Sequence, residues 1–77
     1  MVALQRRPDA ERRLMRNEAA GEVIVEFVRH GAFLKCSAVH VASGIEVSAT
    51  GPAHEPRSLE RIAIAKLNRA LAARAAG

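Results

Sequence analysis

Residues 22–51 read EVIVEFVRHGAFLKCSAVHVASGIEVSATG, and apolar side chains recur in this stretch at every second position. A period of two is the spacing of β-strands, whereas one face of a helix repeats every three or four residues. Gly31 and Gly44 interrupt the alternation, and glycine at such interruptions is typical of tight hairpin turns. The stretch therefore predicts an antiparallel meander of three strands, near residues 22–29, 32–41 and 45–50.

Two separate turn assignments define the inward face of this meander. A two-residue turn at His30-Gly31 and another at Ser43-Gly44 place the same residues of the middle strand on one face. On the opposite face, the first turn sets Glu26 against Lys35, an attractive cross-strand pair. The residues expected to point inward are Val23, Val25, Phe27, Leu34, Cys36, Ala38, Ile45, Val47 and Ala49.

The last segment predicts a helix near residues 58–74 that covers the inward face of the sheet. Ser58 has the side chain of a helix N-cap, since its hydroxyl can accept from a free N–H of the first turn. Seven alanines between residues 63 and 76 favour a helix and let it lie close to the sheet. Its apolar stripe consists of Leu59, Ala63, Ile64, Leu67, Ala70 and Leu71.

Residues 1–21 differ from the rest of the chain because they are rich in arginine and almost free of β-branched residues. They predict either a short helix from Pro8 to Ala20, ended by Gly21, or a disordered basic arm. The expected fold class is thus α+β. A three-stranded antiparallel meander carries one C-terminal helix on one face, with an optional short N-terminal helix. Residues 22–77 form the single domain.

Composition restricts the class of protein further. The 77 residues carry a formal net charge of +4, and sixteen of them are alanine, so a domain this short has a thin core. The single cysteine excludes an intramolecular disulfide. No apolar run has the length of a signal-peptide core or of a membrane span. We therefore expect a cytoplasmic protein that does not enter a membrane.

The residue types that carry chemistry do not converge in the sequence. Cys36 and His40 lie four positions apart on one strand, roughly 13 Å, which is too far for one zinc ion or for a nucleophile–base pair. The loop with His54 and Arg57 predicts either a weak anion site before the helix or a solvated connector. We expect no catalytic, cofactor-binding or metal-binding residue, no small-molecule substrate, and hence no enzyme.

The outward face of the meander carries five large apolar side chains, whereas a sheet with one solvated face carries mostly polar residues there. A large apolar patch of this kind indicates a covered surface. The cover is a second copy in a homodimer, another protein, or the N-terminal helix through Leu14 and Met15. The two outer strands also have open edges, which invite pairing. The predicted interaction face consists of Ile24, Val28, Phe33, Val39 and Val41.

Basic residues suggest nucleic-acid binding as the alternative function. A cluster of arginines is the electrostatic footprint of phosphate binding. However, the chain contains neither Tyr nor Trp, and both Phe residues are expected on the faces of the sheet, so bases have no platform on which to stack. Any binding should then be weak and independent of sequence. The predicted basic surface consists of Arg12, Arg13, Arg16, Arg57, Arg61 and Arg69.

Two resemblances to known families add to these patterns. The run from Gly21 to Pro52, followed by LERIAIAKL at residues 59–67, resembles a family of small bacterial proteins of unknown function. That resemblance covers about residues 21–72 and implies a compact ββ(β)α domain without an assigned activity. With an N-terminal helix, the order α-β-β-β-α is similar to that of the double-stranded-RNA-binding domain. Gly51-Pro-Ala-His54 is similar to that family's Gly-Pro-x-His motif, which lies there between the first two strands.

Overall fold

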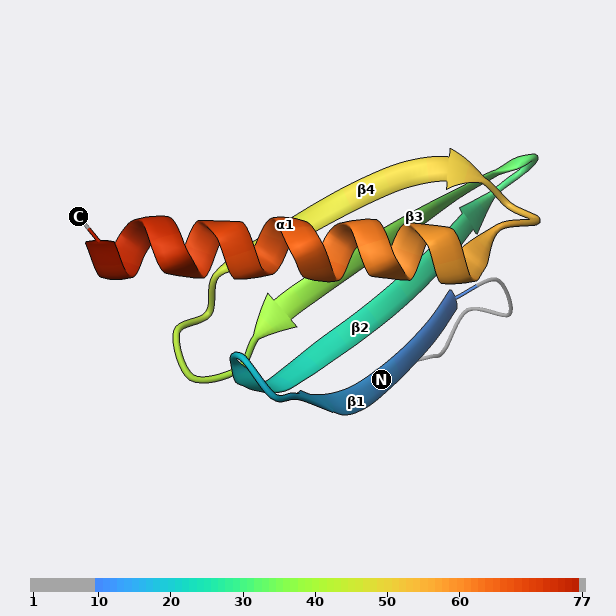
Figure 1. The fold of residues 1–77 in the computed structure, drawn as a ribbon. Coiled ribbons are helices and arrows are strands. Elements are labelled where there is room, and N and C mark those ends of the chain that lie inside the picture. The colour runs from blue at the N-terminus through green and yellow to red at the C-terminus, as the bar shows by residue number, and fades with distance from the viewer. Residues whose placement is uncertain (1–9, 77) are drawn as a thin grey trace.

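The computed structural model describes residues 10–76 of the chain. It contains one four-stranded antiparallel sheet in the order β1-β2-β3-β4, and the helix α1 lies across one face of that sheet (Figure 1). The other face carries no second layer of the described chain. The elements are β1 (Ala10–Asn17), β2 (Gly21–His30), β3 (Phe33–His40), β4 (Glu46–Pro52) and α1 (Pro56–Ala76).

The expected α+β class, meander and C-terminal helix are confirmed, but the sheet has four strands rather than three. The extra strand is β1, so the N-terminal helix or frayed arm expected up to Gly21 is wrong for residues 10–17. The part of that expectation that falls on residues 1–9 lies outside the described residues. An order of β-β-β-β-α also removes the N-terminal helix on which the similarity to the double-stranded-RNA-binding domain depended.

A three-residue connection joins β1 to β2. Asn17 lies opposite Gly21, and the Asn17 carbonyl accepts a hydrogen bond from the Ala20 N–H at 3.0 Å. The Asn17 side-chain oxygen accepts a second one from the Ala19 N–H at 3.1 Å. Gly21 has a φ of 89°, a left-handed conformation that glycine adopts without steric cost. The same conformation ends many helices, which is why Gly21 also fitted a helix end.

The strand register differs by two residues from the expected one at both turns. Glu26 lies opposite Ser37 instead of Lys35, because the first turn is Gly31-Ala32 and has its positive φ, 61°, at the first central position. At the second turn the His40 N–H donates to the Ile45 carbonyl, which makes the loop longer than two residues. A shift of two leaves every side chain on its original face.

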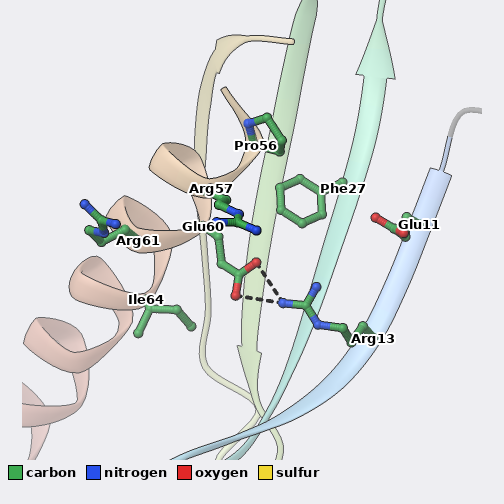
Figure 2. A pocket seen from close by; sticks show the side chains of 8 residues that line it. All are labelled: Glu11, Arg13, Phe27, Pro56, Arg57, Glu60, Arg61 and Ile64. Atoms are coloured by element: carbon green, nitrogen blue, oxygen red, sulfur yellow. Dashed lines mark hydrogen bonds and ion pairs between the residues drawn. The ribbon is translucent and has the colours of Figure 1, made fainter. Parts of the chain in front are cut away.

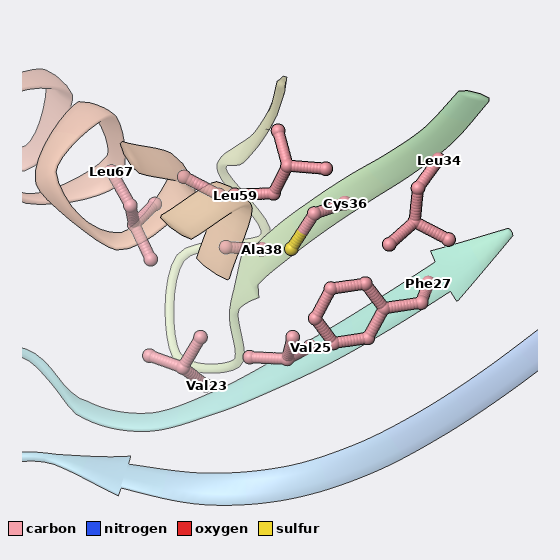
Figure 3. Packing of buried hydrophobic residues seen from close by; sticks show 9 residues of the cluster. Val23, Val25, Phe27, Leu34, Cys36, Ala38, Leu59 and Leu67 are labelled. Carbon is pink, nitrogen blue, oxygen red and sulfur yellow. The ribbon is translucent and has the colours of Figure 1, made fainter. Parts of the chain in front are cut away.

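The core therefore contains the residues expected from the sequence. Six of the nine inward residues are buried, and Ile45, Val47 and Ala49 are partly buried against them. Leu59, Ala63 and Leu67 are the buried residues of α1, and Figure 3 shows two of them above Cys36 and Ala38. The small side chains of β3 let the helix come close. The buried sheet residues are Val23, Val25, Phe27, Leu34, Cys36 and Ala38.

The helix begins two residues earlier than expected, at Pro56. Its first backbone bond runs from the Leu59 N–H to the Glu55 carbonyl at 3.2 Å, so Ser58 lies within the first turn and is not the N-cap. Proline suits the first position of a helix because its missing N–H would have no partner there. Further along, the Lys66 ammonium donates to the Ser48 carbonyl of β4 at 2.5 Å, which ties the helix to that edge strand.

Candidate functional site

The outer face of the sheet, defined as the face turned away from α1, carries four of the five residues of the predicted interaction face. The fifth, Val41, follows the end of β3, where its N–H donates to the Glu22 carbonyl. Ile24 and Val39 lie opposite each other on the two central strands, and Phe33 lies between His30 and Pro52. Phe33 is 60% exposed and Val41 46%. Apolar side chains of this size and exposure are the feature that most distinguishes this face from an ordinary solvated sheet surface.

Two details of the outer face could not be read from the sequence. Leu14 belongs to it, because β1 is a strand and Leu14 lies opposite Ile24; its side chain is 59% exposed. The expected cover by Leu14 and Met15 is therefore wrong, since Leu14 extends the patch and Met15 packs against the core on the other face. A polar row also crosses the face and separates Ile24 and Val39 from Phe33. That row consists of Arg12, Glu26, Ser37 and Ser48.

A groove lies on the opposite side of the sheet, between β1 and α1 (Figure 2). Its volume is about 590 Å³. One guanidinium nitrogen of Arg13 donates to both carboxylate oxygens of Glu60 at 2.7 Å, and this ion pair bridges the groove. The hydrogen bond and the negative charge of Glu60 raise the pKa of Arg13. Arg57 and Arg61 line the groove on the helix side and carry its remaining positive charge.

The structure does not gather the six predicted basic residues on one surface. Arg12 and Arg16 lie on the outer face of β1, opposite Glu26 and Glu22. Arg13 points to the helix side of the sheet, where Glu60 holds it. The other three predicted residues, at positions 57, 61 and 69, are exposed on α1. Glutamates therefore lie beside each of the three predicted arginines of β1, and the other three predicted arginines lie on α1.

His40 joins two loops at one end of the sheet. Its Nε2 lies 2.7 Å from the Ala20 carbonyl, and its Nδ1 lies 2.7 Å from the Ser43 hydroxyl. Because a carbonyl only accepts, Nε2 carries the proton of this hydrogen bond. Both ring nitrogens are thus engaged, and His40 ties the β1–β2 turn to the β3–β4 loop.

Cys36 lies in the core and is fully buried. Burial raises the pKa of its thiol to about 11, and the Glu60 charge contributes in the same direction. A thiol with this pKa stays protonated near neutral pH and is a poor nucleophile or metal ligand. Among residues 10–76, no group of three or more His, Cys, Asp or Glu side chains has the arrangement of a metal site. Over the same residues, no helix is long and apolar enough to cross a membrane.

The fold and its bare face define a small two-layer α+β domain. The model of one protein family, a domain of unknown function designated DUF6898, matches residues 20–75. The chain therefore belongs to that family, which supports the resemblance to proteins of unknown function seen in the sequence. The match includes β2, β3, β4 and most of α1, whereas β1 precedes it. No curated protein and no solved structure matches the chain.

Proposed function

We propose that this domain is a non-enzymatic self-association module whose docking surface is the outer face of the sheet. The observation that carries the proposal is the exposure of large apolar side chains on that face, at 60% for Phe33 and 59% for Leu14. α1 covers only the other face. A thin core makes association favourable, because a partner adds buried apolar area that one short chain does not supply.

The chemistry of the described residues supports a non-enzymatic role. The one thiol, that of Cys36, is buried with its pKa raised to about 11. The imidazole of His40 has both nitrogens occupied in a contact between loops. In the groove beside α1, Arg13 and Glu60 are paired with each other, so neither is free to act as an acid, a base or an electrostatic catalyst.

Nucleic-acid binding through the basic residues is the alternative. The exposed arginines at positions 57, 61 and 69 of α1 favour it, because they carry positive charge on one element. Carboxylates oppose the three arginines of β1. Phe27 is only 7% exposed, and the exposed Phe33 lies on the outer face of the sheet, away from the arginines of α1. We rank this function second, since stacking and a continuous basic surface are what single strands and duplexes require.

Light scattering after size exclusion, over a micromolar concentration series, tests the proposal. We expect the wild-type chain to form a dimer and Phe33→Glu to form a monomer with an unchanged circular-dichroism spectrum. Ile62→Glu is the matched control, because Ile62 is 50% exposed on α1, away from the outer face. A wild-type chain that stays monomeric throughout, or equal effects of the two substitutions, would overturn the proposal.

A further inference from the structure

The charges on the outer face follow a pattern that specifies how two copies would pack. We infer that the copies associate face to face about a twofold axis parallel to the strands, so that β1 of one copy lies over β4 of the other. This inference rests on the self-association proposed above and adds its geometry.

The pattern comes from the strand register. Side chains that share the face of Ile24 alternate along each strand, and the charged ones among them have one sign per strand. β1 is positive, β2 negative, β3 positive and β4 negative, with three charges of each sign in total. The charged residues are Arg12 and Arg16 on β1, Glu22 and Glu26 on β2, Lys35 on β3, and Glu46 on β4.

Symmetry connects this pattern to one arrangement. Homodimers pair the same surface of both copies about a twofold axis, and stacked sheets commonly pack with nearly aligned strands. An axis perpendicular to the strands would place each strand over itself, with β1 arginines against β1 arginines and β2 glutamates against β2 glutamates. An axis parallel to the strands reverses the strand order, so β1 faces β4 and β2 faces β3. Strands of opposite charge then face each other, and the Arg16–Glu46 and Glu26–Lys35 pairs are offset by one outward position along the strands.

The same axis brings the central apolar residues together. Ile24 and Val39 are register partners on β2 and β3, so the axis places Ile24 over Val39 of the partner subunit. Leu14 lies in the same row, and the axis places it over the aliphatic part of the side chain of Glu46 of the partner subunit. Arg16 is the next outward residue of β1, and its longer side chain reaches that carboxylate.

The area of the face indicates a weak dimer. Four strands about 4.8 Å apart and roughly 23 Å long present a face of roughly 450 Å² per copy. Two such faces bury about 900 Å², below the roughly 1,200 Å² at which stable specific interfaces begin and in the range of weak, transient ones. Micromolar dissociation constants are therefore expected, in a range where a few charge pairs change the affinity measurably.

Charge reversal distinguishes the two axes. Arg16→Glu and Glu46→Lys should each weaken the homodimer roughly tenfold, because each places like charges together at two symmetric positions. Mixed in equal amounts, the two variants should form a heterodimer with about wild-type affinity, since opposite charges again meet at both positions. Native mass spectrometry identifies the heterodimer and sedimentation equilibrium gives the affinities. Arg69→Glu, on α1, is the control and should leave dimerisation unchanged.

The outcomes separate this inference from the proposed function. If Phe33→Glu abolishes a wild-type dimer but the mixed variants do not recover affinity, the axis is wrong and self-association stands. If Arg16→Glu alone strengthens the dimer, the axis is perpendicular to the strands, and the inference is overturned. A chain that is monomeric at all concentrations overturns both.

Discussion

Cys36 shows how much one residue's surroundings determine its chemistry. Its thiol lies between β3 and α1, where Figure 3 shows the sulfur directed toward the helix. Desolvation there penalises the thiolate and raises the pKa of the thiol from 9.0 to about 11. From the sequence, Cys36 was expected to be a small core residue on the inward face, and its full burial confirms this.

The first prediction concerns the reactivity of this thiol and its effect on stability. Near neutral pH, a thiol reagent such as dithionitrobenzoate should modify Cys36 only as fast as the domain opens, and at once in concentrated urea.

The pKa of the thiol is higher in the folded chain than in the unfolded chain. The contribution of the thiol to stability is therefore complete below pH 9.0 and is lost as pH rises through about 11. The free energy of unfolding should therefore fall over that window. Cys36→Ala should remove this part of the pH dependence, and rapid modification of the folded chain would contradict the prediction.

At the scale of elements, β1 shows where sequence patterns reach their limit. AERRLMRN, residues 10–17, consists mostly of good helix formers and contains no β-branched residue. It is a strand because β2 offers a hydrogen-bonding edge, and because Arg13 and Asn17 contact Glu60 and Asn68 of α1. These contacts join residues about fifty positions apart, so no local pattern contains them.

The meander and the helix were predictable because alternation and helical period are local signals. The exact pairing was not, since both hairpins differ from the expected register by two residues. Burial selects the face of a side chain, and a shift of two preserves the face. Turn geometry selects the register, and it depends on which turn position takes the positive φ of Gly31 or Gly44.

The second prediction concerns the close approach of β4 to α1. A Cβ atom added at Gly51 would lie 2.9 Å from Cδ2 of Leu59, whose side chain is buried and has little room to move. We expect Gly51→Ala to lower the free energy of unfolding by about 1–3 kcal/mol through overpacking. Urea denaturation measures it. Thr50→Ala, at the exposed neighbouring position, should change stability by less than about 0.5 kcal/mol.

Combining Gly51→Ala with Leu59→Ala provides a check on the mechanism. Leu59→Ala alone removes a buried side chain and should cost about 2–5 kcal/mol. The space it leaves accommodates the new methyl group, so the double variant should lose less stability than the sum of the two single changes. Additive losses would show that the Gly51 substitution acts through backbone conformation instead of through Leu59.

At the scale of the whole molecule, the described part of the chain is a flat body of 39 × 33 × 19 Å. Its thinnest dimension is that of one sheet and one helix, which leaves the outer face of the sheet uncovered by the described chain. The apolar residues of that face were predictable from alternation on β2 and β3. Leu14 and the strand-by-strand alternation of charge were not, because both depend on β1 being a strand beside β2.

The third prediction concerns nucleic acids and follows from the distribution of charge over the molecule. Carboxylates lie opposite or are paired with the arginines of β1, so the exposed arginines of α1, at positions 57, 61, 69 and 74, are the ones best placed to contact phosphates. We expect binding to duplex RNA, duplex DNA and single strands to be weaker than micromolar and alike for all three. Fluorescence anisotropy at several salt concentrations measures this.

The affinity should fall steeply with salt. In a plot of the logarithm of the binding constant against the logarithm of the salt concentration, the slope should be at most about 0.9 in magnitude per phosphate contacted. Replacing these four helix arginines by alanine should remove most of this binding, while the dimer persists. Tight, salt-resistant binding to one of the three nucleic acids would instead make nucleic-acid recognition the primary function, with α1 rather than the outer face of the sheet as its surface.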